Sequence, residues 1–221
     1  MKRLIIATMT SFVMWASSIP ALAMDWSRAF EKARYSIVAL LHDGGNCTAF
    51  SINETDKYFF TAYHCINEDR NMLLWKETIP NYVFQGTFRV RRVVKKSLEL
   101  DLAILEADYG MIAMVPGKEP QRGQELASIG YAFSESEPFI LSSIVASVKD
   151  ANAYGQKRRI VLKDNQDLSG MSGGPVIDRR GEVVTMVQQG LTVNGQVSNI
   201  AYGTSIKQIK EFAKGYWRTQ P

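Results

Sequence analysis

The sequence of 221 residues lacks low-complexity runs, and beyond residue 23 it lacks any apolar run long enough to cross a membrane. Apolar residues make up 46% of the chain, so a full core can be buried and disorder is excluded as the default state. Long internal helical patterns are also missing. A sheet folded on itself is therefore favoured over alternating strands and helices.

Residues 1–23 differ in composition from the rest. Two cations, Lys2 and Arg3, precede a mostly apolar stretch from Leu4 to Ala16, and the cleavage-site sequence Ala-Leu-Ala follows at 21–23. This pattern predicts a cleaved secretory signal peptide and hence an exported protein, periplasmic or secreted. The alternative is an uncleaved anchor helix, but the polar residues in the segment leave its apolar run short for a membrane span.

An excess of charge is missing from the mature chain. Loss of Lys2 and Arg3 reduces the 26 Lys and Arg to 24, against 22 Asp and Glu. Basic residues gather at 89–96 and 157–159, where Arg89 and Arg91 alternate with an apolar residue as on a solvated strand face. We expect no nucleic-acid partner, although a basic face could favour acidic substrates.

Only two cysteines are present, Cys47 and Cys65, 18 residues apart. In an oxidising compartment we expect them to form a disulfide, which contributes about 3 kcal/mol on the loop-entropy model. Two buried free thiols are the alternative. A metal site is another, since His42 and His64 raise the possible ligands to four. Adjacent His64 and Cys65 would point to opposite faces of a strand, so we expect no metal and no other cofactor.

Short strands separated by polar turns fill the rest of the chain. They are expected in two series, at residues 36–41, 48–52, 57–62, 82–84, 87–94 and 102–106, and at 125–131, 139–148, 159–162, 174–177, 182–188 and 200–202. The Pro- and Gly-containing segment 116–123 separates the two series. This predicts an all-β fold of two packed six-stranded antiparallel β-barrels, 24–116 and 117–221, with a closing C-terminal helix over 206–213.

The sharpest local signal is a serine set among glycines at 170–175, GMSGGP. Glycines let the backbone turn tightly, and such a turn aims neighbouring N–H groups at a developing oxyanion. Taken alone, a glycine-flanked serine is more often a surface turn. As a nucleophile Ser172 needs a base to take its proton, and imidazole is the best matched.

The sequence offers two histidines as that base. His64 ends an apolar strand and could be presented at a barrel rim, whereas His42 stands beside a Gly-Gly turn and is interpreted as structural. The base must be held in one tautomer by a buried acceptor. Asp101, directly ahead of an apolar strand, is the candidate carboxylate, although a lone Asp there is more often a turn or capping residue.

Three blocks together resemble the catalytic blocks of trypsin-like serine peptidases, in the order His, Asp, Ser: TAYHC at 61–65, DLAIL at 101–105 and GMSGGP at 170–175. The resemblance implies a serine endopeptidase that forms an acyl-enzyme, with Ser172 as nucleophile and His64 as general base, oriented by Asp101. The α/β-hydrolase fold is excluded, because it needs a His after the serine and none follows Ser172.

The resemblance also implies roles for the surrounding residues. The amides of Gly170 and Ser172 would form the oxyanion hole. Cys47 and Cys65 match the disulfide that brackets the base in animal trypsins, and residues 45–50 match the stretch that contacts substrate beyond the cut.

A primary specificity pocket is implied in the same way. Gln166 would lie at its base, with Gln188, Gln189 and Gly190 as a wall. Trypsin has at the base an Asp that selects Arg or Lys, and a register error would put a neighbouring Asp there. The specificity is therefore unassigned.

One departure from animal trypsins concerns activation. Met171 replaces the Asp that would pair with a new N-terminus, and the sequence contains no Ile-Val-Gly-Gly activation site. We therefore expect activity on polypeptides without cleavage beyond signal removal, as in the bacterial members that the N-terminal stretch resembles. We further expect a monomer without membrane contact. A catalytically inactive binding module of the same fold is the alternative.

Overall fold

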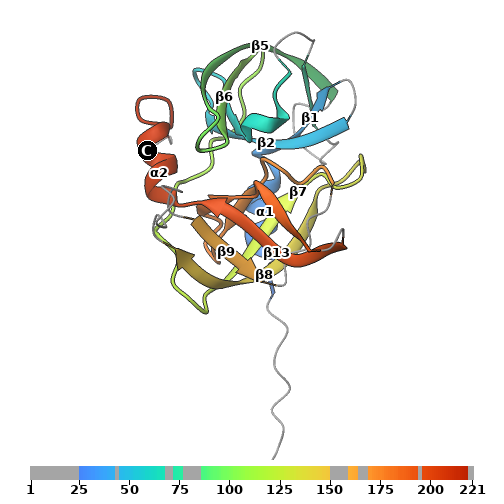
Figure 1. Ribbon diagram of the computed structural model, residues 1–221. Coiled ribbons are helices and arrows are strands. Elements are labelled where there is room, and N and C mark those ends of the chain that lie inside the picture. Colours follow the sequence, from blue (N-terminus) through green and yellow to red (C-terminus); the bar gives the residue numbers. More distant parts are fainter. Residues whose placement is uncertain are drawn as a thin grey trace, which may run out of the picture.

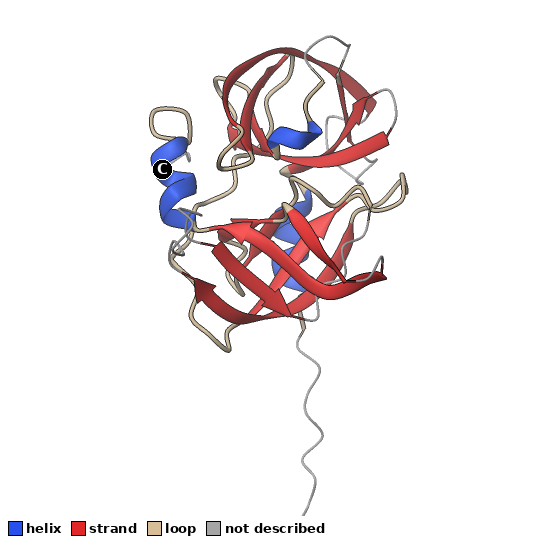
Figure 2. Ribbon diagram, in the orientation of Figure 1, coloured by secondary structure: helices blue, strands red, loops and turns tan. Residues whose placement is uncertain are grey.

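The computed structural model describes residues 25–42, 45–67, 72–76, 86–149, 159–163, 169–193 and 196–218. Strands dominate these ranges and form two β units, one above the other in Figures 1 and 2. Two short α-helices, α1 (Ser27–Arg34) and α2 (Ile206–Phe212), and a 3-10 turn, η1 (Tyr63–Cys65), complete the described elements. Within these ranges no helix is both long and apolar enough to cross a membrane.

The first unit is a closed antiparallel barrel in the strand order β1-β2-β3-β6-β5-β4. Its strands are β1 (Ile37–His42), β2 (Gly45–Asn53), β3 (Tyr58–Thr61), β4 (Leu73–Lys76), β5 (Gly86–Ser97) and β6 (Leu102–Ala107). Strand β2 is buried from Cys47 to Asn53, on both of its faces, whereas β5 alternates exposed and covered residues. Strand β2 therefore lies inside the molecule and β5 on its outer surface.

The second unit is an antiparallel sheet in the order β11-β10-β7-β8-β9-β13-β12. Its strands are β7 (Glu125–Gly130), β8 (Phe139–Lys149), β9 (Arg159–Lys163), β10 (Pro175–Ile177), β11 (Val183–Met186), β12 (Gln189–Val193) and β13 (Gln196–Thr204). The two edge strands of this sheet, β11 and β12, are separated in the sequence only by Val187 and Gln188. They are therefore two halves of one strand. Thr185 of β11 donates a 2.6 Å hydrogen bond to the carbonyl of Thr204 on β13, which nearly closes the sheet.

The predicted fold of two six-stranded antiparallel β-barrels with a C-terminal helix is thus confirmed. Two strands go beyond the sequence pattern. Strand β4 is only four residues long and ends in a buried lysine, and β12 has a glycine as its second residue. Lysine and glycine are both infrequent in strands. The strand predicted at 82–84 lies outside the described residues. The domain boundary at 116 stays a prediction, in a strand-free stretch between β6 and β7.

Each helix contacts the barrel to which it does not belong in sequence. Helix α1, ahead of β1, packs on the β10–β11 turn, where the Lys32 side chain reaches the carbonyl of Arg180. The segment from α2 onward packs on the first barrel, with the ring of Trp217 5.9 Å from Phe50 and 6.0 Å from Phe60. The two helices therefore fasten the barrels together.

A buried lysine fixes the position of α1. Lys76 of β4 has no exposed surface, and its ammonium group donates a 2.6 Å hydrogen bond to the carbonyl of Arg34, the last residue of α1. A cation at a helix C-terminus is stabilised by the carbonyls that have no partner within the helix. Lys76 therefore acts as a polar anchor in an otherwise apolar strand.

Candidate active site

Asp101 and His64 meet at the mouth of the first barrel. Asp101 precedes β6 in a turn closed by its N–H on the carbonyl of Leu98, and its φ of 51° lies in the left-handed region. One carboxylate oxygen accepts from the backbone N–H of His64 at 3.0 Å, and the other lies 2.9 Å from its Nδ1. This two-point contact fixes the backbone of η1 and places the proton on Nδ1, so Nε2 is the ring atom that can accept a proton.

Side chains of the second barrel hold the Asp101 turn through hydrogen bonds to its backbone carbonyls. The side-chain amide of Gln188 donates to the carbonyls of Leu100 at 2.6 Å and Asp101 at 3.0 Å. The hydroxyl of Thr204 lies 3.1 Å from the Leu100 carbonyl and 2.9 Å from the Gln188 amide oxygen. Gln188 and Thr204 are buried. Their hydrogen bonds hold in place a backbone conformation that a non-glycine residue adopts at a cost.

Glycines shape the turn that carries Ser172. Gly170 and Gly173 have φ values of 98° and 83°. A Cβ on Gly173 would overlap the carbonyl of Thr48 and the hydroxyl of Thr61, and one on Gly170 would overlap the carbonyl of Tyr131. Both positions therefore require glycine for conformation and for space.

Thr48 of β2 connects this turn to the first barrel. Its N–H donates to the carbonyl of Ser172 and its hydroxyl to the carbonyl of Gly170, both at 2.8 Å. The same hydroxyl accepts from the N–H of Tyr131 at 2.9 Å, and the carbonyl of Thr48 accepts from the hydroxyl of Thr61. Sequence reasoning gave Thr48 no individual role; its one signal there is a hydroxyl within a buried apolar strand.

The predicted disulfide is confirmed. Cys47 and Cys65 are bonded, with their Cα atoms 6.0 Å apart, and join β2 to η1. The sulfur of Cys65 lies 3.7 Å from the carbonyl oxygen of Ser172. The disulfide thus brings the segment of His64 against the turn that carries Ser172, so the structure gathers all three predicted catalytic residues where the barrels meet.

The structure describes some of the predicted pocket residues and not others. Gln166 lies outside the described residues. Gln189 and Gly190 begin β12, where they pair with Tyr202 and Ala201 of β13. The Gln188 side chain turns to the Asp101 loop, a use that the sequence did not indicate. A wall formed by this segment stays a prediction.

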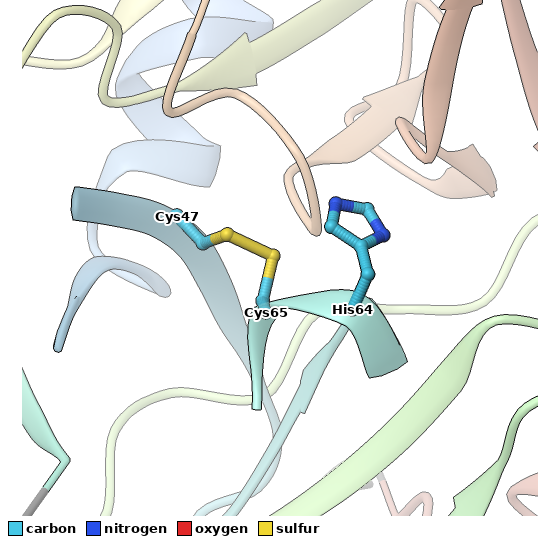
Figure 3. Close-up of side chains that lie close together, drawn as sticks. All are labelled: Cys47, His64 and Cys65. Carbon is cyan, nitrogen blue, oxygen red and sulfur yellow. A yellow bond between two sulfur atoms is a disulfide. The ribbon is translucent and has the colours of Figure 1, made fainter. Parts of the chain in front are cut away.

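One of the reasons for expecting no metal site does not hold. His64 and Cys65 belong to a 3-10 turn, so the argument that they point to opposite faces of a strand is wrong. Ligand atoms of Cys47, His64 and Cys65 lie within 4.8 Å of one another. Figure 3 shows the imidazole of His64 beside the disulfide. His42 belongs to β1 and is outside this group.

Basic residues on β5 are matched by nearby acceptors. Arg91 pairs with Asp108, and this hydrogen bond lowers the pKa of the Asp108 carboxyl. Arg92 pairs with Glu106 at 2.7 Å, and Lys95 donates to the carbonyl that ends α2. These contacts agree with a solvated strand face. Residues 157–158 of the second basic run lie outside the described residues.

Comparison with known proteins identifies the family. A model of the trypsin-like peptidase domain matches residues 47–186. Similar solved structures include the inactive form of the Rv3671c protease, with a TM-score of 0.65 and 16% identity over 84% of this chain and 90% of that one. Another is the HtrA-type protease AlgW with a tripeptide, with a TM-score of 0.72 and 18% identity over 85% of this chain and 62% of that one. No curated protein sequence matches significantly. The family match covers more than half of the sequence, and the chain belongs to the trypsin-like peptidases.

Proposed function

We propose that this protein is an exported serine endopeptidase that cleaves polypeptides through an acyl-enzyme intermediate. Ser172 is the nucleophile, His64 the general base, and Asp101 orients the base. The observation that carries the proposal is the two-point contact of the Asp101 carboxylate with the ring and the backbone N–H of His64. An Asp that only closed a turn would not need both oxygens on one histidine.

The proposed reaction begins with a proton transfer from Ser172 to His64. His64 Nε2 takes the proton of the Ser172 hydroxyl while its oxygen attacks the substrate carbonyl carbon. The imidazolium that forms keeps its Nδ1 proton on Asp101, which stabilises the positive charge. The proton then passes to the leaving amine, and a water molecule, activated by the same histidine, hydrolyses the acyl-enzyme.

The turn around Ser172 supports an oxyanion hole. Within the part of the chain that the structure describes, the N–H groups of Gly170 and Ser172 have no acceptor in the protein. Their carbonyls are both held by Thr48, so the orientation of the turn is set before substrate arrives. Fixed donors of this kind stabilise a developing negative charge because they need no reorganisation.

The surroundings of Met171 support activity without zymogen cleavage. Its side chain is buried among apolar residues of the second barrel that include Leu126 and Val176. A buried methionine has no charge with which to capture a new N-terminus. The mature chain is therefore proposed to be active once the signal peptide is removed. Export is tested by N-terminal sequencing of the protein recovered from the periplasm and from the medium.

A cleavage profile of the mature chain on a peptide library tests the function. We expect cleavage by the unmodified protein and none by Ser172→Ala, and the aligned products would give the missing specificity. Equal product patterns from both proteins, or none from either, would instead favour the inactive binding module.

A further inference from the structure

The disulfide between Cys47 and Cys65 lies beside His64, so three side chains that can ligate a metal meet there. Cys47, His64 and Cys65 each offer one ligand atom, and the three atoms lie within 4.8 Å of one another. Two thiolates and an imidazole are a preferred donor set for Zn²⁺, which binds them tetrahedrally at about 2.0 to 2.3 Å. Sulfurs bonded to each other are closer together than two ligands of one zinc ion, so on reduction they must move apart while the imidazole moves closer; their Cα atoms are 6.0 Å apart. While the sulfurs are bonded to each other, neither is a thiolate, so the site exists only after reduction.

Each of the three residues is held in its own segment by contacts that do not depend on the disulfide. Cys47 is paired with Leu40 across β1 and β2. The N–H of Cys65 donates to the carbonyl of Ala62, and the N–H of His64 donates to Asp101. The backbone of the cluster therefore has its own support when the disulfide opens.

His64 has a carboxylate partner of the kind that orients zinc-binding histidines. Its Nδ1 is bound to the Asp101 carboxylate, which orients the ring. In Figure 3 one ring nitrogen lies on the side of the disulfide. The imidazole is 46% exposed while both cysteines are buried, so an ion and a completing water can enter from the histidine side.

We propose that the reduced protein binds one Zn²⁺ through the sulfurs of Cys47 and Cys65 and Nε2 of His64, and that this ion blocks catalysis. A dithiol supplies two electrons and two protons to the disulfide and leaves as its own cyclic disulfide. Zinc binding then displaces the two thiol protons. The metal occupies the lone pair with which His64 would accept the Ser172 proton, so the chain is inactive until the disulfide forms.

Zinc stoichiometry and affinity test the site without any need for activity. Ser172→Ala protein is reduced with a dithiol, freed of reductant without air, and titrated with Zn²⁺ against a chromophoric chelator, while circular dichroism monitors the fold. We expect one equivalent bound by the reduced form and none by the oxidised form. His64→Gln should bind at least tenfold more weakly, and the matched variant His42→Gln should bind as before.

Three results would overturn the site: no stoichiometric binding by the reduced chain, unchanged affinity in His64→Gln, or loss of the fold on reduction. Inhibition depends in addition on the proposed function and is measured separately, as zinc-dependent loss of peptide cleavage by the reduced wild type. If cleavage is absent in every state while zinc still binds, the proposed function fails and the metal site stands. If the reduced enzyme cleaves equally well with zinc bound, the inhibition is wrong.

Discussion

The turns that carry Asp101 and Ser172 are built in opposite ways. The Ser172 turn obtains its left-handed backbone from Gly170 and Gly173, whereas Asp101 adopts a φ of 51° without being glycine. Each turn is also held by the barrel to which it does not belong, through Thr48 in one case and Gln188 in the other. The site is therefore a product of barrel docking, with conformation supplied by residue type at one turn and by contacts at the other.

The largest effect is expected at Gly173, where both the backbone conformation and the lack of space for a side chain require glycine. Gly173→Ala places a Cβ on the carbonyl of Thr48, so the turn must move. We expect kcat/KM to fall by about two orders of magnitude, as on loss of an oxyanion donor, and stability to fall by about 3 kcal/mol. Urea unfolding and steady-state kinetics measure the two losses.

Gly123→Ala is the matched control. Gly123 has a similar φ of 81° but nothing within 4 Å of an added Cβ. It should lose about 1 kcal/mol from backbone strain and keep its activity. Equal losses in both variants would show that close packing of the Ser172 turn is not needed.

Removal of the Thr48 hydroxyl comes next. Thr48→Val leaves the buried carbonyl of Gly170 and the N–H of Tyr131 without their partner. We expect about 2 kcal/mol less stability and about a tenfold to hundredfold lower kcat with little change in KM. Ser51→Ala, which removes a buried hydroxyl of the same strand bonded to Met111, should lower stability while leaving kcat unchanged.

Loss of the hydrogen bonds from Gln188 to the Asp101 turn should have a smaller effect. Gln188→Leu removes both hydrogen bonds to the carbonyls of the turn, and we expect about a tenfold lower kcat with a shifted pH profile of kcat, because His64 loses its fixed orientation. Thr204→Val acts on the same carbonyl of Leu100, so the double variant should lose less than the sum of the single losses. Strict additivity, or an unchanged pH profile, would make Gln188 merely structural.

The smallest effect is expected on the outer face of β5, far from both turns. The Asp108 pKa is lowered in the folded protein by Arg91, so this pair contributes stability above the unfolded pKa of Asp and loses it as pH falls through the lower folded value. The difference in urea midpoint between wild type and Arg91→Ala should be small at pH 7 and vanish only when the pH falls below the lowered folded pKa of Asp108. A difference that grows on acidification would reverse this assignment.

Most of what could be predicted from the sequence followed from the chemistry of individual residue types. The glycines around Ser172, the imidazole of His64 and the carboxylate of Asp101 have chemistry visible in short blocks, and alternating strands and turns predicted both barrels. The supports were hidden because they connect distant parts of the chain: Thr48 bonds to Gly170, and Gln188 to Leu100. The 3-10 turn at His64 was hidden as well, since an apolar strand runs directly into it.

Treatment with a fluorophosphonate, followed by intact-mass measurement and peptide mapping, tests whether Ser172 is a nucleophile activated by His64. We expect one adduct per chain, located on Ser172, formed without prior proteolysis of the mature protein, absent in Ser172→Ala and greatly slowed in His64→Ala. An unlabelled wild-type protein, or an adduct on Ser172 that forms equally fast in His64→Ala, would contradict this expectation.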